Sequence, residues 1–227
     1  MSDFDPLYKD LRSKQFEGWG GASYQRRLKG CEEAIDDLVS SNKIPMPPAR
    51  VLELGCGNAM AAFLMAKRGY ETYGIDISAE AVDWAQERFR LFGLAGAFTC
   101  GDVREMPCFE DGFLDIVMDG ACLHCLIGDD RRQGLPEIRR ILSEDGTFVV
   151  STMCGPPRSE AAIKAYDSQI ECLVENGRPY RSLKPLDAIM EELRKAGFVV
   201  MDYSVRENPW WDHATIVCSN DGQQIQS

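Results

Sequence analysis

The sequence predicts an α/β fold, namely a doubly wound, mostly parallel, seven-stranded sheet with helices on both faces. Two observations predict it. Along most of the 227 residues, short apolar runs typical of buried strands alternate with amphipathic runs typical of helices. No internal repeat or long linker interrupts the alternation, and the length suits one domain. Alternating units of this kind place successive strands in parallel through right-handed crossovers.

The elements of the first half follow from the spacing of apolar residues. Strands are expected at 49–54, 71–77, 97–100 and 113–121, where the apolar runs end at glycine or polar residues. Helices are expected at 31–41, 59–68 and 78–92, where apolar residues recur at helical spacing. Gly69 can end the second of these helices, and Ser78 can cap the third.

The second half continues the alternation and then departs from it. A helix at 130–142 and a strand at 146–152 are followed by an insertion, 153–184, with a helix at 159–175. A helix between Pro185 and Gly197 and closing strands at 198–207 and 214–219 complete the sheet. The polar residues 220–227 predict a disordered tail.

Charge and cysteine content exclude several classes of protein. Lysine and arginine number 25 against 36 acidic residues, so the net charge of −11 has the wrong sign for attracting a phosphate backbone. The sequence has neither an apolar run of about 18 residues nor a secretory signal pattern. Nine cysteines, an odd number, argue against a disulfide framework. We therefore expect a cytoplasmic protein with reduced thiols that binds neither nucleic acid nor membrane.

The strongest local signal is the turn Glu53-Leu54-Gly55-Cys56-Gly57-Asn58 after the first strand. Its two glycines remove Cβ atoms where backbone passes close to a ligand, and the following helix points free N–H groups toward it. Met60 stands where the nicotinamide and flavin fingerprint has its third glycine, which disfavours a dinucleotide site. No Gly-Lys-Ser/Thr follows, which excludes a phosphate-binding P-loop.

Acidic residues stand at the ends of the next strands. Asp76 lies 21 positions after Gly55, where a carboxylate can accept hydrogen bonds from both hydroxyls of a ribose. Asp102 follows the third strand and can accept from an adenine amine, and Asp119 ends the fourth. Because the carboxyl ends of parallel strands meet at one edge of a sheet, these acids predict one nucleoside pocket.

These motifs resemble those of the class I S-adenosylmethionine-dependent methyltransferases. The likeness is carried by VLELGCGNA (51–59), YGIDIS (73–78), GDVREMP (101–107), LDIVMDGACLHCL (114–126) and IRRILSEDGTFVVST (138–152). It implies a single domain of the Rossmann-like methyltransferase fold over residues 1–219. It also implies S-adenosyl-L-methionine as the cofactor.

The resemblance further assigns roles to residues. It implies that the glycine turn lies against the methionine part of the cofactor, that Asp76 holds the ribose, and that Asp102 with Val103 holds the adenine. Residues 1–48 are expected to form a helical lid over the cofactor. The predicted cofactor-binding residues are Trp19, Tyr24, Glu53, Gly55, Cys56, Gly57, Asp76, Ile77, Asp102, Val103 and Asp119.

The acceptor side is predicted from Cys122-Leu123-His124-Cys125 and from Cys154, which follow neighbouring strands. His124 is the candidate catalytic residue, a general base that removes a proton from a thiol, hydroxyl or amine acceptor. The three thiols leave a second interpretation open, a thiolate site for a metalloid substrate of the kind arsenite methyltransferases have, although the cysteine spacing differs from theirs. No resident metal is predicted.

The later part of the chain is expected to shape the acceptor pocket, with the insertion 153–184 as a substrate cap. Candidates for binding a substrate carboxylate or phosphate, and for a pocket wall, are Arg158, Arg178, Tyr180, Arg181, Trp210, Trp211 and His213.

The sequence thus predicts methyl transfer by direct displacement to a small-molecule acceptor, carried out by a monomer or homodimer. Direct displacement needs alignment rather than a nucleophilic side chain. The alternatives are a protein lysine or N-terminal methyltransferase, an aminopropyl transferase and a non-catalytic binding subunit. The lysine alternative is weakened because Asp119-Gly120-Ala121-Cys122 stands where such enzymes carry Asn/Asp-Pro-Pro-Phe/Tyr.

Overall fold

The computed structural model describes residues 4–221. Its main sheet has seven strands in the order β3-β2-β1-β4-β5-β10-β9. Neighbouring strands from β3 to β5 are parallel, whereas β10 is antiparallel to β5 and β9. The strands are β1 (Arg50–Leu54), β2 (Glu71–Asp76), β3 (Ala97–Cys100), β4 (Leu114–Asp119), β5 (Leu142–Cys154), β9 (Val199–Arg206) and β10 (Asp212–Ser219). The predicted mostly parallel, seven-stranded sheet is confirmed.

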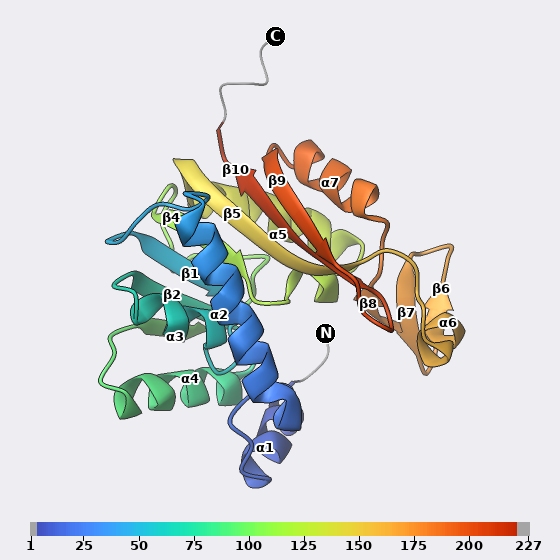
Figure 1. Ribbon diagram of the computed structural model, residues 1–227, viewed down its shortest axis with the longest axis horizontal. Helices are drawn as coiled ribbons and strands as arrows, with labels where there is room; N and C mark the ends of the chain where they lie inside the picture. Colours follow the sequence, from blue (N-terminus) through green and yellow to red (C-terminus); the bar gives the residue numbers. More distant parts are fainter. Residues whose placement is uncertain (1–3, 222–227) are drawn as a thin grey trace.

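Helices cover both faces of this sheet, as predicted. Figure 1 shows α2 in front of the strands and α5 behind them. The helices are α1 (Asp5–Ser13), α2 (Tyr24–Ser40), α3 (Met60–Ala66), α4 (Ala79–Leu91), α5 (Asp129–Ile141), α6 (Glu160–Ala165) and α7 (Leu186–Lys195), with short 3-10 turns η1 (Gly21–Ser23) and η2 (Leu123–Cys125). None of the helices between residues 4 and 221 combines the length and apolar character that crossing a membrane requires.

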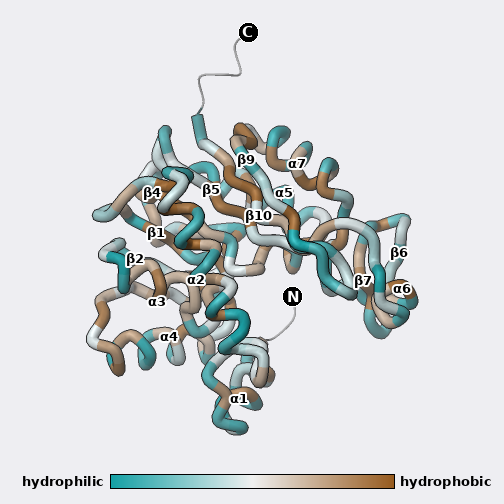
Figure 2. Tube along the Cα trace, viewed as in Figure 1, coloured by the Kyte–Doolittle hydropathy of each residue, from teal (hydrophilic) through white to brown (hydrophobic). Residues whose placement is uncertain are grey.

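Alternating side chains on the strands produce two cores. Val51 of β1 packs with Ile35 of α2 on one face. Its neighbour Leu52 packs with Ile138 of α5 on the other face. Successive residues of a strand point to opposite faces, so one apolar run serves both layers. Figure 2 shows hydrophobic stretches in the strands β4 and β10.

The predicted helix at 159–175 is wrong beyond its first turns. α6 ends at Ala165, and a separate three-stranded sheet follows: β6 (Tyr166–Asp167), β7 (Cys172–Glu175) and β8 (Arg178–Ser182). β7 and β8 form an antiparallel hairpin with Glu175 opposite Arg178. The two residues between them, Asn176 and Gly177, have φ of 52° and 73°. An Asn-Gly pair with positive φ at both positions suits the twist of a two-residue hairpin, and this local signal outweighs the helical spacing upstream.

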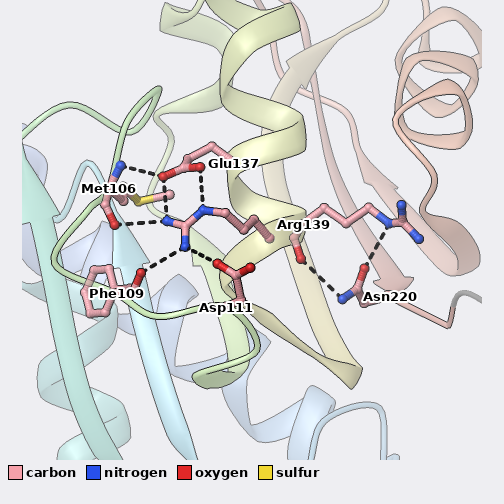
Figure 3. Close-up of polar contacts among 7 residues, drawn as sticks. Met106, Phe109, Asp111, Glu137, Arg139 and Asn220 are labelled. Carbon is pink, nitrogen blue, oxygen red and sulfur yellow. Dashed lines mark hydrogen bonds and ion pairs between the residues drawn. The ribbon is translucent and has the colours of Figure 1, made fainter.

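The prediction of a disordered tail from residue 220 onward is wrong for Asn220, which is well packed. Residues 222–227 lie outside the described part of the chain. The Asn220 amide is buried and donates to the carbonyl oxygens of Leu142 and Ser143 at 3.1 and 2.9 Å. Its Oδ1 accepts from Arg139 Nε at 3.1 Å (Figure 3). Beside it, Arg140 joins Glu137 on α5 to the carbonyls of the loop before β4. Asn220 therefore ties the end of β10 to the α5–β5 junction.

Replacement of Asn220 by alanine is expected to lower the free energy of unfolding by about 2 kcal/mol, because buried carbonyl groups lose their donor. Urea unfolding followed by circular dichroism measures this change. Asn208, whose amide donates only to the nearby Arg206 carbonyl at 3.4 Å, provides the matched control. Equal stability of N220A and N208A would contradict the assignment.

Candidate active site

A cavity of about 1790 Å³ opens at the carboxyl ends of the parallel strands. It lies where the order of the sheet reverses direction, between β1 and β4, which is where ligands bind in folds of this kind. The loops after β1, β2, β3 and β4 all contribute to it. The predicted site residues that line it are Trp19, Glu53, Gly55, Cys56, Gly57, Asp76, Ile77, Asp102, Val103, Asp119 and His124.

The glycine turn after β1 requires glycine at two positions. Gly55 and Gly57 have φ of 58° and 54°, a region that favours glycine. A Cβ on Gly55 would lie 2.8 Å from the Cβ of Cys122, and one on Gly57 would lie 2.8 Å from the Tyr8 hydroxyl oxygen. The turn can therefore pack this closely against η2 and α1 only without side chains.

Glu53 positions the helix that follows the turn. Its carboxylate is buried and accepts hydrogen bonds from the backbone N–H groups of Ala61 and Ala62, at 3.1 and 2.8 Å. These groups belong to the first turn of α3, where N–H donors lack partners within the helix. Burial raises the pKa of Glu53 to about 7.

A pH-dependent stability follows from this raised pKa. The folded chain binds the Glu53 proton more tightly than the unfolded chain, whose ordinary value is 4.5, so this stabilisation is complete below pH 4.5 and is lost as the pH rises through 7. Between pH 4.5 and pH 7, the unmodified protein should lose roughly 3 kcal/mol of unfolding free energy through Glu53. We expect this loss to be absent from E53Q. Urea unfolding at a series of pH values measures it, with the exposed Glu144 as the E144Q control. The same pH slope in E53Q and the unmodified protein would contradict the prediction.

Asp76 lies at the end of β2 beside the glycine turn. Its two carboxylate oxygens accept from the backbone N–H of Gly57 at 2.8 Å and of Ser78 at 2.9 Å. Burial raises its pKa, and these two hydrogen bonds oppose the shift. Each carboxylate oxygen has a second lone pair, so the group can accept two further hydrogen bonds from a ligand in the cavity.

The loop after β3 forms a further side of the cavity. Asp102 lines the cavity with Ile77 and Val103. Both oxygens of Asp102 also accept from the guanidinium of Arg104, at 3.0 and 2.6 Å. Burial alone would raise the pKa of Asp102, but the hydrogen bonds from Arg104 outweigh it and lower the pKa. Asp102 is therefore a carboxylate held in a fixed orientation at the cavity edge.

The N-terminal segment covers the site through a residue that the sequence did not single out. Tyr8 of α1 is buried, lines the cavity and packs its ring 5.3 Å from that of Trp19. The Ser78 hydroxyl donates to Asp5, which fastens α1 to the start of α4. The sequence could have indicated Tyr8 through its position on an amphipathic helix that has Pro6 in its first turn. Tyr24, predicted as the second anchor, does not line the cavity; it is buried against Asn58.

Asp119 organises the loop that carries His124. One of its oxygens accepts from the backbone N–H of Cys122 and Leu123, at 2.7 and 2.9 Å, and the other accepts from Ser151 N–H at 3.3 Å. Burial raises the pKa of Asp119 to about 6. These bonds turn the chain after β4 into η2, so Asp119 acts by positioning this turn.

His124 is buried, and its Nδ1 has no hydrogen-bond partner among the described residues. Burial lowers its pKa well below the ordinary 6.5, and the positive charge of Arg181 adds to the shift. The imidazole is therefore neutral at pH 7.

The three cysteines predicted to converge do not all reach the cavity. Cys122 and Cys125 line it, whereas Cys154 is buried in the core beneath the opposite face of the sheet. On β5 the cavity is lined instead by Val149, Ser151 and Met153, because alternate residues of a strand share one face. Burial raises the pKa of the Cys154 thiol to about 11. Within residues 4–221, no three His, Cys, Asp or Glu side chains are arranged to hold a metal ion.

The far wall of the cavity comes from the small sheet and from β9 and β10. Of the candidates named from the sequence, those that line it are Arg178, Tyr180, Arg181, Trp210, Trp211 and His213. Ser151 Oγ lies 2.9 Å from Nε2 of His213. Arg158 does not line the cavity, because it pairs with Asp212.

The residues present fit an adenosyl sulfonium ligand. The side-chain-free glycine turn, the Asp76 carboxylate with unused lone pairs, and the loop of Asp102 lie around one cavity. Tyr8 and Trp19 shield that cavity from one side. An aromatic lid and carboxylates suit the adenosyl and cationic parts of such a molecule.

The comparisons with known proteins agree with this geometry. Residues 52–150 match the family model described as "Methyltransferase domain". The chain is 32% identical over 103 residues to the ribosomal RNA small subunit methyltransferase C of Alcanivorax borkumensis, a match covering 45% of this chain and 29% of that protein. It is 24% identical to a ubiquinone biosynthesis O-methyltransferase of Xanthomonas campestris, covering 87% of this chain and 82% of that protein. The chain thus spans under a third of the first relative and most of the second.

A solved structure shares the fold. The 1,6-didemethyltoxoflavin-N1-methyltransferase of Burkholderia thailandensis, solved with S-adenosylhomocysteine, superposes with a TM-score of 0.64 at 19% identity, covering 94% of this chain and 86% of that one. The family match lies over the glycine turn and over the loops of Asp76, Asp102 and Asp119. Residues 52–150 are therefore similar to methyltransferase domains, and this stretch carries all four of these loops.

Proposed function

We propose that this chain transfers a methyl group from S-adenosylmethionine to a small-molecule acceptor that is held between the glycine turn and the small sheet β6–β8. The observation that carries the proposal is the size and course of the cavity. Its volume of about 1790 Å³ exceeds the roughly 300–1,000 Å³ of a pocket for one small molecule. It continues from the glycine turn to the wall formed by β8, β9 and β10, so it offers room for a second molecule beside the cofactor.

The proposed division of the cavity follows from its lining. Asp76 and Asp102 would hold the ribose and the adenine, and the glycine turn would receive the methionine part. S-adenosylmethionine, when bound, would supply an electrophilic methyl carbon and, as the C–S bond breaks, a neutral thioether leaving group. Tyr8 and Trp19 would exclude water from one side, and Trp211 and His213 would wall the acceptor on the other.

His124 is the proposed general base. It follows β4, at the boundary between the cofactor side and the acceptor side of the cavity. Its neutral imidazole would take the proton that a thiol, hydroxyl or amine acceptor releases during transfer. The Asp119 hydrogen bonds to Cys122 and Leu123 hold the turn that presents it.

A small-molecule acceptor is favoured over a macromolecular one by the walls of the cavity. The hairpin β7–β8 and the end of β9 stand over the acceptor side, where a nucleic acid or protein substrate would need an open surface. The likeness to the ubiquinone biosynthesis enzyme extends over most of both chains, whereas the likeness to the ribosomal RNA enzyme covers less than half of this one.

Calorimetry followed by turnover tests this function. The full chain is titrated with S-adenosylmethionine and S-adenosylhomocysteine, and then incubated with S-adenosylmethionine and a panel of small thiols, phenols, amines and arsenite. Mass spectrometry detects a mass gain of one methyl group. We expect cofactor binding and methylation of at least one small molecule. Cofactor binding without any small-molecule product, or methylation of added protein alone, would contradict the proposal.

A further inference from the structure

The acceptor side of the cavity is lined by arginines that have no acidic partner. Within residues 4–221 none of them forms an ion pair, although acidic residues number 36 against 25 basic ones. They are Arg26, Arg27, Arg178, Arg181 and Arg206. By contrast, Arg104, Arg131 and Arg158, elsewhere in the fold, each pair with a carboxylate. Unpaired guanidinium groups that face a cavity can bind an anion from outside the chain.

Arg206 lies on one side of the acceptor space. On β9 it stands opposite His213 of β10, and its Nη1 is 3.6 Å from the place of a Cβ on Gly30 of α2. The side chain therefore extends from the sheet toward α2, across the mouth of the cavity. Burial lowers the pKa of His213 to about 4, and the charges of Arg206 and Arg27 contribute to the shift.

Arg181 lies on the other side, where β8 meets η2. Its Nη1 donates to the carbonyl oxygen of Tyr180 at 3.1 Å. Burial raises the pKa of Cys125, whereas the charge of Arg181 opposes that shift. The same charge acts on His124. Arg181 and Arg206 thus flank the space beside the two histidines.

Four carboxylates that line the cavity accept hydrogen bonds from groups other than Arg181 and Arg206. Glu53, Asp76 and Asp119 accept backbone N–H groups, and Asp102 accepts from Arg104. Glu175, opposite Arg178 on the hairpin, is exposed at the rim. None of these acids neutralises Arg181 or Arg206 within the described chain, so the two cations remain available.

We propose that Arg181 and Arg206 form an anion subsite that holds a carboxylate or phosphate group of the acceptor while its methyl-accepting atom lies near His124. This inference rests on the proposed function and names the class of its substrate. Planar guanidinium groups bind both anions through paired N–H donors. The acceptor is thus an anionic thiol, phenol or amine rather than a neutral or cationic one.

The test uses binding rather than turnover. The full chain, saturated with S-adenosylhomocysteine, is titrated by calorimetry with salicylate, anthranilate and 2-mercaptobenzoate, each paired with its neutral amide, and with phenyl phosphate paired with phenol. The same titrations are made with R181Q, R206Q and the control R132Q, which removes one positive charge from the exposed surface of α5. The carboxylate and phosphate arms show which anion the subsite prefers.

We expect at least one anion to bind ten times more tightly than its neutral partner, and R181Q and R206Q each to lose about tenfold of that affinity while R132Q keeps it. The affinity for S-adenosylhomocysteine should stay unchanged in all three variants. The subsite would be overturned if the anions bound no more tightly than their neutral partners. It would also be overturned if R181Q and R206Q bound the anions as tightly as the unmodified chain does. A loss of S-adenosylhomocysteine affinity in R181Q and R206Q would also overturn it, since the arginines would then serve the cofactor carboxylate. Failure of the unmodified chain to bind S-adenosylhomocysteine would instead reject the proposed function itself.

Discussion

Replacement of Asp76 by asparagine is expected to weaken the binding of S-adenosylhomocysteine by about 100-fold or more. The amide removes the negative charge and one of the two acceptor oxygens, and each hydrogen bond to a charged group contributes about 1.5–3 kcal/mol. The same oxygens accept the N–H groups of Gly57 and Ser78, so the substitution also loosens the turn that borders the cavity. Calorimetric titration of the full chain measures the dissociation constant.

Asp115 offers a matched control for this substitution. It also lies on a parallel strand and accepts a backbone N–H, that of Arg50 at 2.7 Å, but it stands near the start of β4 and does not line the cavity. We expect D115N to bind S-adenosylhomocysteine as the unmodified chain does. If D76N stayed within threefold of D115N, the assignment of the ribose site would be wrong.

Replacement of His124 by glutamine is expected to lower kcat by about 100-fold or more, a loss typical of a general base. The measurement is turnover with the panel acceptor that reacts fastest in the unmodified protein. The affinity for S-adenosylhomocysteine should change little, which separates a lost base from a collapsed pocket. A kcat within threefold of the unmodified value would show that His124 only shapes the cavity.

The pH profile provides a second readout for His124. Because its pKa lies well below 6.5, the imidazole stays unprotonated throughout the neutral range, and kcat should not fall between pH 8 and pH 6.5. At lower pH, kcat of the unmodified protein should decline as His124 becomes protonated. The residual kcat of H124Q should not show this decline. A midpoint near 6.5 in the unmodified protein would contradict the buried environment of His124.

The alternation of strands and helices made the main sheet predictable. Ser78 illustrates why: its side chain accepts the N–H of Ala81, a local bond that the sequence alone specifies. The grouping of the strand-end acids could also be predicted from the sequence, because parallel topology brings Asp76, Asp102 and Asp119 to one edge of the sheet. These features depend on neighbours in sequence or on a general rule of the fold.

Other features depended on contacts that sequence spacing does not determine. Ile163, Tyr166, Ile170 and Leu173 have helical spacing, yet Tyr166 and Leu173 pair across two antiparallel strands. The Asn176-Gly177 turn was the local signal that could have corrected this prediction. Cys154 is the last residue of β5, which neighbours β4 as expected, but the alternation of side chains along β5 turns it away from the cavity.

The lid was predicted as a segment but not residue by residue. Trp19 and Tyr8 line the cavity, whereas Tyr24 does not. Tyr8 reaches Gly57 because α1 is fastened to α4 by Asp5 and by Arg12, which pairs with Glu80 at 2.7 Å. These bonds join residues that are 73 and 68 positions apart, so their partners could not be read from the N-terminal sequence.

The most direct test of the account is a crystal structure of the full chain with S-adenosylhomocysteine. The account predicts that the ribose hydroxyls donate to Asp76, that the adenine lies against Ile77 and Val103 beside Asp102, and that the sulfur faces His124 with open space toward Arg181. A nucleoside bound anywhere else, or a sulfur turned away from His124, would contradict it.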